Sequence, residues 1–271
     1  MSELTPTEVS EIKKRRWQRL LNTTVVFVGV AFVFGVFHPY SNQMNAIREF
    51  KRLGGTFDID VNAPRKPKWL RDFCDKRGGM PIGYLVFFGR VRGASFHGSD
   101  QSATPVLETL SPLDDISKLD LAYVQIARQD LELMQSFPEL RTLYLDFVTL
   151  TPNALADLDD FQNLTKVSFL HVELTASDFA QLSKLRNLAV LFLEGTPATD
   201  AAVERLTTLP HLRVLSLSRT QMTDEGLWEL RKCTELKLLI VSDTSVTREG
   251  LSRFRNARPD VSVHSSHTPG P

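Results

Sequence analysis

The stretch "LRVLSLSRTQMTDEGLWELRKCTE" (Leu212–Glu235) directly follows "LAVLFLEGTPATDAAVERLTTLPH" (Leu188–His211). Both have 24 residues, with apolar residues at places one, four and six and Thr-Asp at places twelve and thirteen. The same frame fits six consecutive units, which start at Ile116, Leu140, Leu164, Leu188, Leu212 and Leu236. No unit requires an insertion, and a register this strict predicts a solenoid of stacked repeats.

The spacing within the unit predicts its local structure. Apolar places four and six alternate, as on one face of a short strand, whereas places sixteen, nineteen and twenty-two form one stripe of a helix. Place twelve is threonine in five of the six units, where its hydroxyl can cap the helix: Thr151, Thr175, Thr199, Thr223 and Thr247. Pro152 suits the first helical position, and Asp200 and Asp224 suit the positive helix end. Each unit therefore reads as strand, turn and capped helix.

This pattern resembles the leucine-rich repeat family, in the form "LxxLxLxxTxhTDxGLxxLxxLxx", where h is apolar. The match is closest at "LSLSRTQMTDEGLWEL", and the resemblance covers residues 116–258. It implies an α/β solenoid, a right-handed arc with a parallel sheet on its concave side and helices outside. Place nine departs from the common asparagine, and three units have a threonine there that could bond to backbone groups in the turn: Thr196, Thr220 and Thr244.

Both ends of the repeat array are expected to differ from its middle. Residues 92–115 continue the helix columns through Leu107, Leu110 and Leu113, but the strand half is expected to be lost in "RGASFHGSDQSA". We therefore expect a degenerate first repeat there. At the other end Pro259 breaks the pattern, so residues 259–271 are expected to form a disordered tail.

Residues 38–91 have a different pattern. We expect a helix in "SNQMNAIREFKRLGG", a strand in "TFDIDV", a short helix in "KWLRDFCDKRGG" and a strand in "IGYLVFF". This order resembles the N-terminal region of membrane-anchored leucine-rich repeat proteins of planctomycete bacteria, and it implies an α+β cap over the first edge of the solenoid. Its basic cluster could contact anionic lipid headgroups or form a solvated surface: Arg65, Lys66, Lys68, Arg71, Lys76 and Arg77.

The N-terminus contains an apolar run. Residues 20–37 are 18 residues without a charge, about 27 Å as a helix, which is close to the thickness of a bilayer core. A cleaved signal peptide and a buried soluble helix are alternatives, but we prefer a single-pass transmembrane helix. The basic tail at residues 1–19 then favours a cytoplasmic N-terminus, with the repeats on the extracytoplasmic side.

Composition and motifs exclude several function classes. The formal net charge is zero, which gives no indication of a nucleic-acid partner. The six histidines show no metal-ligand spacing, and no phosphate loop or nucleophile motif occurs. Cys233 stands in a core column and is expected to be a buried thiol, as is Cys74 in the cap. We therefore predict a protein that is not an enzyme and holds no cofactor.

The surface available for binding is the concave face of the sheet, to which strand places three, five, seven and eight point. Aromatic and apolar side chains there are flanked by charges, which is typical of protein-binding surfaces. The alternative is that they only pack sideways along the sheet. The candidate residues are Tyr123, Tyr144, Asp146, Phe147, Leu170, His171, Phe192, Glu194 and Arg219.

The sequence thus predicts a non-catalytic, membrane-anchored scaffold that binds a protein or peptide on its concave face. The alternative is a structural envelope protein that self-assembles through its cap or helix faces. A size in solution that depends on concentration would distinguish the second hypothesis from the first.

Overall fold

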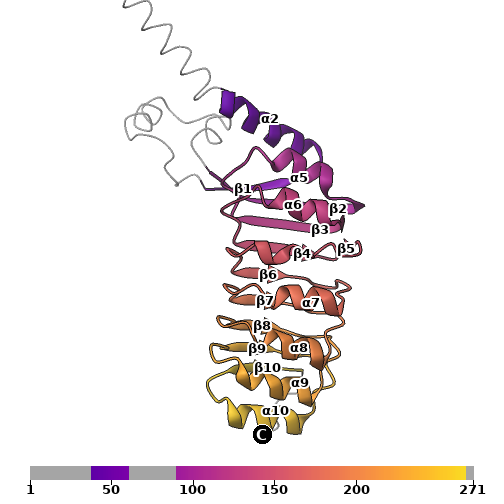
Figure 1. Ribbon diagram of the computed structural model, residues 1–271, viewed down its shortest axis with the longest axis vertical. Coiled ribbons are helices and arrows are strands. Elements are labelled where there is room, and N and C mark those ends of the chain that lie inside the picture. Colours follow the sequence, from indigo (N-terminus) through magenta and orange to yellow (C-terminus); the bar gives the residue numbers. More distant parts are fainter. Residues whose placement is uncertain (1–37, 61–89, 267–271) are drawn as a thin grey trace, which may run out of the picture. The chain divides into compact units, whose positions relative to one another are not determined.

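The computed structural model describes residues 38–60 and 90–266 (Figure 1). The chain divides into two compact units, Met1–Asn45 and Ala46–Pro271, and helix α2 (His38–Arg52) crosses their boundary. The strands are β1 (Thr56–Asp60), β2 (Arg90–Ser102), β3 (Lys118–Ile126), β4 (Thr142–Asp146), β5 (Thr149–Leu150), β6 (Lys166–Ser168), β7 (Val190–Phe192), β8 (Val214–Ser216), β9 (Leu238–Ile240) and β10 (Ser262–His264). The other helices are α5 (Thr104–Leu110), α6 (Arg128–Met134), α7 (Ala176–Leu182), α8 (Asp200–Leu206), α9 (Asp224–Glu229) and α10 (Arg248–Ala257), with 3₁₀ turns η2 (Leu158–Asp160) and η3 (Leu230–Lys232).

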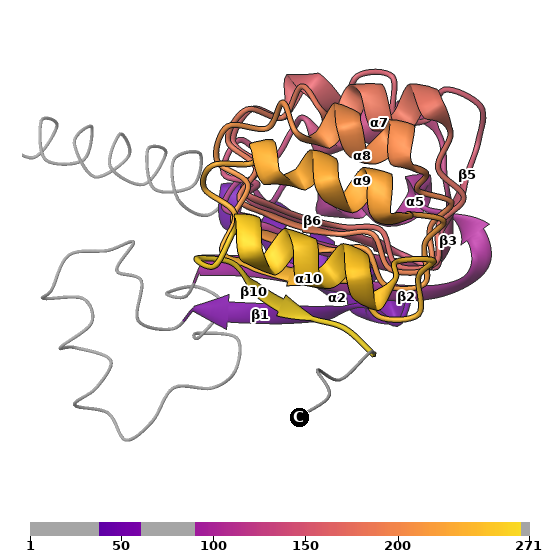
Figure 2. The same ribbon diagram turned by 90° about the horizontal axis from the view of Figure 1, so that it is seen from below.

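The predicted repeat solenoid is confirmed. The strands follow one another in the order β1-β2-β3-β4-β6-β7-β8-β9-β10, and every neighbouring pair from β2 onward is parallel. Place four pairs with place four in successive repeats, as in Leu119 with Leu143 and Leu191 with Leu215. The helices of the repeats lie on one side of this sheet (Figure 2).

The core lies between the sheet and the helices. All six side chains at place four are fully buried: Leu119, Leu143, Val167, Leu191, Leu215 and Leu239. The helix columns at places sixteen and nineteen face them and are at most 2% exposed. Each of these side chains contributes about 1.5–3 kcal/mol by burial, but only because the neighbouring repeat covers it.

The first repeat retains its strand, contrary to the sequence expectation. Residues 90–102 form β2, which pairs with β3 and places Ala94 opposite Leu119 and Phe96 opposite Leu121. Ala94 and Phe96 are both buried, so a small and a large side chain occupy columns where the later repeats have leucine. The strand was missed because Gly93, Gly98 and three polar residues after it obscure the alternation.

The N-terminal cap is partly described. The expected helix is α2, which ends before Gly54 at a φ of 93°, and the expected strand is β1, antiparallel to β2. Phe50 of α2 is fully buried against Phe57 and Phe96, with ring centroids 4.6 and 6.4 Å away. The expected helix at 68–79 with Cys74, the strand at 82–88 and the apolar run at 20–37 lie outside the described residues. Among the residues that are described, no helix is both long and apolar enough to cross a membrane.

The repeat that starts at Leu140 contains no α-helix in its second half, contrary to the prediction from Thr151 and Pro152. Turns follow Thr151, and only η2 is helical. Asn153 has a φ of 61°, a left-handed conformation that cannot continue a right-handed helix. Apolar columns are still filled by Leu155 and Leu158, which are fully buried.

Three of the predicted threonine caps are present. Thr175, Thr223 and Thr247 accept hydrogen bonds from backbone N–H groups of the first helical turn, at 3.0–3.3 Å. Thr199 makes no such bond, so its predicted role as a side-chain cap is wrong. Each capping threonine also donates its hydroxyl proton to an aspartate, which orients it. Thr199 has alanine at both places that supply this aspartate elsewhere, Ala176 and Ala202.

The orienting aspartate comes from two different places. In the earlier repeats it stands at place fifteen of the same unit, where Asp178 accepts from the Thr175 amide at 2.8 Å and Asp130 from the Ala127 amide at 2.7 Å. In the later repeats it stands at place thirteen of the preceding unit. Asp200 accepts from the Thr223 amide and Asp224 from the Thr247 amide, both at 2.8 Å. The predicted charge at the helix end is thus also a cross-link between repeats.

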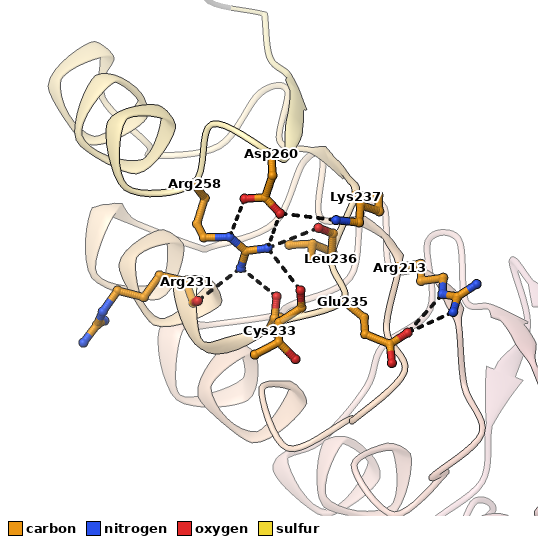
Figure 3. A network of polar contacts seen from close by, with 9 residues as sticks. Arg213, Arg231, Cys233, Glu235, Leu236, Lys237, Arg258 and Asp260 are labelled. Atoms are coloured by element: carbon orange, nitrogen blue, oxygen red, sulfur yellow. Dashed lines mark hydrogen bonds and ion pairs between the residues drawn. The ribbon is translucent and has the colours of Figure 1, made fainter.

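The C-terminal end is closed by one arginine (Figure 3). Arg258 donates to the carbonyl oxygens of Arg231, Cys233 and Leu236, at 3.1, 2.7 and 3.3 Å, and forms an ion pair with Asp260. This hydrogen bond holds the pKa of the Asp260 carboxyl far below its usual range. Cys233 is buried as predicted, and burial raises the pKa of its thiol to about 11.

The start of the tail, which was expected to be disordered from residue 259, contains a strand. Ser262–His264 form β10, which pairs in parallel with β9 in the same register as the repeats. Val261 is buried and Val263 half-buried, so two apolar side chains hold the strand after Pro259. The residues that follow Pro259 therefore extend the sheet by one strand, β10.

Candidate binding surface on the open face of the sheet

The open sheet face consists of the side chains at strand places three and five, opposite to the helices. Because places four and six are buried, these alternate residues face solvent. Most are half-buried by their neighbours along the sheet, and the two serines Ser168 and Ser216 are buried, at 1% and 4% exposure. The apolar and basic members are Lys118, Tyr144, Lys166, Val190, Phe192, Val214, Leu238 and Ile240.

Basic and aromatic side chains alternate at the N-terminal end of this face. The Nζ of Lys118 lies 5.4 Å from the centre of the Tyr144 ring. The Nζ of Lys166 lies 5.2 Å from the centres of both the Tyr144 and the Phe192 rings. At these distances the ammonium groups are attracted by the ring faces. Beyond Phe192 the apolar side chains of the face are aliphatic, with Val214, Leu238 and Ile240, and Val190 stands on the same strand as Phe192.

Place eight has a left-handed backbone in every repeat, inside β3 in the first of the six and after the strand in the others. The φ values are 53–57° at Tyr123, Phe147, His171, Arg219 and Asp243, and 69° at Gly195. Residues other than glycine rarely adopt this conformation, which costs about 1–2 kcal/mol at each. The turn recovers backbone bonding: the amide of Phe147 donates to the carbonyl of Leu170 at 2.7 Å, and the amide of His171 donates to the carbonyl of Glu194 at 2.8 Å.

The left-handed turn aligns three rings at the rim of the sheet. Tyr123 stacks on Phe147 and Phe147 on His171, each with ring centroids 5.0 Å apart and planes 12° and 18° from parallel. Tyr123 is 46% and Phe147 40% exposed, and they are the exposed large hydrophobic residues of the described chain. Gly195 ends the row, since a Cβ there would lie 2.4 Å from Nδ1 of His171. We call Tyr123, Phe147 and His171 the ring row.

The charged candidates differ in how fully they are engaged. Oδ1 of Asp146 accepts hydrogen bonds from the hydroxyl of Ser168 at 2.7 Å and the amide of Leu170 at 2.9 Å, so it fixes the turn of the next repeat. Arg219 lies between Glu194 and Asp243, at 3.8 and 3.7 Å. These exposed pairs are long and loosely held, so they are open to exchange with a partner.

The structure brings the nine predicted residues to one face and its rim, in two rows. Tyr144 and Phe192 stand on the open sheet face, and the ring row with half-buried Leu170 stands beside it. Among the nine, Asp146 stabilises the fold, because its carboxylate bonds to Ser168 and Leu170 of the next repeat. The sequence analysis missed Lys118 and Lys166, which occupy place three, and it missed the turn at place eight. A signal for the turn was present, because Gly195 and Asp243 in one column favour a positive φ.

No arrangement for metal or cofactor chemistry is found in the part of the chain that the structure describes. No three His, Cys, Asp or Glu side chains among these residues are grouped to hold a metal ion. The raised pKa of Cys233 disfavours its thiolate, so that residue does not suit a nucleophile.

A hollow of about 490 Å³ lies on the helix side of the repeats. It is lined by Asp200, Glu204, Asp224, Trp228 and Arg253, among others. Asp200 and Asp224 are occupied by cap hydrogen bonds. The Trp228 ring is flanked by two guanidinium groups, Arg231 at 4.5 Å and Arg253 at 3.8 Å. Two of its carboxylates and its tryptophan ring are thus already engaged within the protein, so the open sheet face is the better candidate.

The chain matches no protein-family model and no curated protein. Among solved structures it is similar to internalin C2 from Listeria monocytogenes, at 21% identity and a TM-score of 0.48, over 66% of this chain and 74% of that one. It is also similar to a leucine-rich repeat protein of Leptospira interrogans, at 17% identity, a TM-score of 0.42, and 58% and 44% of the two chains. An internalin F from Listeria monocytogenes has 14% identity and a TM-score of 0.36, over 60% and 57%. With scores below 0.5, none of these proteins says anything about the ligand of this chain.

Proposed function

We propose that this protein is a non-catalytic scaffold that binds a protein or peptide on the open sheet face. The observation that supports this most directly is the pair of aligned rows, Tyr144 with Phe192 and the ring row, along one face of the repeats. Exposed aromatic side chains are rare on surfaces without a partner, and aromatic side chains dominate binding energy where they occur in interfaces. Parallel strands fix these rings in place before a ligand arrives, which lowers the entropic cost of binding.

A pull-down with crosslinking tests this function. The full chain is compared with a Tyr144→Asp, Phe192→Asp variant, and circular dichroism checks that both are folded. A Trp228→Asp variant is the matched control, because it introduces a charge at an aromatic residue on the helix side. A partner that is captured by the wild type and the control, but lost in the double variant, is expected. Equal capture by all three would contradict the proposal and favour self-assembly through the cap or helix faces.

We also propose that residues 20–37 anchor the scaffold in a membrane, with the repeats on the extracytoplasmic side. The support is the charge-free run of 18 residues and the basic side chains before it. Full-length protein is expected in the membrane fraction after carbonate extraction, and a Val28→Arg, Val33→Arg variant is expected in the soluble fraction. Wild-type protein that is released by carbonate would contradict the anchor.

A further inference from the structure

Lys118 and Lys166 differ from most basic residues of the described repeats. Lys184, Arg213 and Lys237 each have a carboxylate within 3.3 Å. Lys118 and Lys166 have no carboxylate within ion-pair distance among the residues that the structure describes, and they contact aromatic rings instead.

No acidic residue near these lysines forms an ion pair with them in the part of the chain that the structure describes. Asp120 is two places after Lys118 on the same strand, and it pairs with His97 at 3.8 Å. Asp146 is engaged by Ser168 and Leu170. Asp58 also lies beside Lys118, because a Cβ built on Gly93 would be 3.0 Å from Cβ of Asp58 and 3.7 Å from Cβ of Lys118. Neither lysine is held in an ion pair within the described residues, so a partner's anion can approach from one side while the rings support the ammonium groups from the other.

We propose that the ligand of the open sheet face is an acidic protein segment, whose carboxylates pair with Lys118 and Lys166 across the Tyr144 ring. This inference rests on the proposed function and adds the chemistry of the partner. Carboxylate and ammonium groups are complementary here, and the aliphatic side chains from Val190 to Ile240 add an apolar continuation to the same face.

The strand spacing gives the segment a pattern. Lys118 and Lys166 stand on β3 and β6, with β4 between them. Neighbouring strands are about 4.8 Å apart, so the two backbones are separated by roughly 10 Å. A chain in the polyproline II conformation advances about 3.1 Å per residue and turns its side chains to the same side every third residue, so two acidic residues three positions apart would reach both lysines. Apolar residues beyond the second acidic residue would lie over Phe192, Val214 and Leu238.

A peptide selection tests this inference together with its premise. A random peptide library displayed on phage is selected on the full chain in mild detergent. The binders are then scored on a Tyr144→Asp, Phe192→Asp variant and on a Lys118→Gln, Lys166→Gln variant. The matched control is Lys184→Gln, Lys232→Gln, which removes the same charge from lysines that already have carboxylate partners.

The expected binders require Tyr144 and Phe192, contain acidic residues three apart with apolar residues on one side, and lose at least about tenfold in affinity on the Lys118→Gln, Lys166→Gln variant alone. Binders that require the aromatic residues but show no excess of acid would overturn this inference and leave the proposed function standing. Binders that never require the aromatic residues would overturn the proposed function itself. Displacement of the peptides by inorganic phosphate but not by glutarate, at equal ionic strength, would overturn the inference of an acidic segment, because the site would then select phosphate over carboxylate.

Discussion

The repeats at residues 116–187 and those at residues 188–258 have the same sheet register but hold their turns by different contacts. In the earlier group place nine is a buried valine in all three units: Val124, Val148 and Val172. In the later group it is a threonine whose hydroxyl donates to the carbonyl of place six, at 2.8 Å for Thr196, 2.6 Å for Thr220 and 3.2 Å for Thr244. The core columns are the same in both groups, so the fold depends on these columns. The residue at place nine determines how each turn is stabilised.

The same division affects the helix caps. In the earlier group the orienting aspartate caps its own unit, as Asp178 does for Thr175. In the later group it reaches the next unit, and the residue facing it is glycine: a Cβ on Gly226 would lie 2.3 Å from Oδ1 of Asp200. An aspartate at place thirteen therefore requires a glycine at place fifteen of the following repeat. The earlier repeats have no such requirement, since they have no aspartate at place thirteen.

The two groups also differ in what they present to solvent. The ring row and both unpaired lysines belong to the earlier group, whereas the later group presents Arg219, Asp243 and aliphatic side chains. The regular hydrogen bonding of the later group coincides with a surface of fewer aromatic residues. Ligand contacts are therefore expected to concentrate on the earlier repeats.

The largest effect is expected from a charge in a shared core column. Leu143→Asp in the earlier group and Leu215→Asp in the later group each place a carboxylate where the side chain is fully buried. Both should lose more than about 4 kcal/mol of unfolding free energy, because nothing in the column can pair with the charge. Circular dichroism during urea denaturation measures this free energy of unfolding. If either variant melts like the wild type, the column assignment fails in that group.

The next effect concerns the end of the later group. Arg258→Met leaves the carbonyls of Arg231, Cys233 and Leu236 without their common donor, and the arginine side chain is only 13% exposed. We expect a loss of about 2–3 kcal/mol at neutral pH and faster alkylation of Cys233. Arg213→Met is the control, because it breaks an exposed pair with Glu235 and should cost under about 1 kcal/mol.

The pH dependence of this end has a definite sign. The pKa of Asp260 is lowered in the folded state by its hydrogen bond from Arg258, so its contribution is present above the ordinary carboxyl pKa and is lost as pH falls through the folded value. The difference between wild type and Arg258→Met should therefore shrink only in strong acid. A difference that stays constant through the strongly acid range as well would contradict the role of this pair.

The repeat period made most of the fold predictable. Once Leu212–Glu235 and its neighbours were aligned, the strand, helix and core columns followed from period alone, because each apolar place has one burial direction. The first strand was missed because Ala94 and Phe96 depart from the leucine pattern at places four and six, and because Gly93 and Gly98 stand beside them. The missing helix after Thr151 depends on the left-handed backbone of Asn153, which no apolar spacing reveals.

The candidate site was less predictable than the fold. Alternation indicated which side chains face solvent, and Tyr144 and Phe192 do so. The stacking of the ring row depends on a left-handed turn at place eight, which aromatic residues disfavour by themselves. The occupation of Asp146 by Ser168 and Leu170 depends on contacts between repeats. Sequence alone does not distinguish such a carboxylate from one free to bind.

An intermediate effect tests the pairing of aspartate and glycine in the later group. Replacing glycine by alanine within a helix normally stabilises by about 1 kcal/mol. Gly226 is buried, however, and in Gly226→Ala the new Cβ displaces the Asp200 carboxylate, so we expect a loss of about 1–2 kcal/mol. In Asp200→Ala, Gly226→Ala the contact with the carboxylate is gone and only that with Cγ of Met222, at 2.9 Å, remains. The double variant should therefore lose less stability than the sum of the two single losses. The chain itself has this combination one repeat earlier, with Ala176 and Ala202. Additive losses in urea denaturation would show that the two residues are not coupled.

The smallest effect distinguishes the two kinds of turn. Thr220→Val gives a later repeat the side chain of an earlier one, and it removes the hydroxyl that donates to the carbonyl of Leu217 at 2.6 Å in a buried place. We expect a loss of about 0.5–1.5 kcal/mol, since valine fills the space but leaves that bond unmade. Thr207→Val is the matched control, because its hydroxyl donates to the carbonyl of Glu204 in an exposed position, where water can replace it. If Thr220→Val costs no more than Thr207→Val, the two turns are interchangeable, and place nine would stabilise the turn in both groups through packing alone.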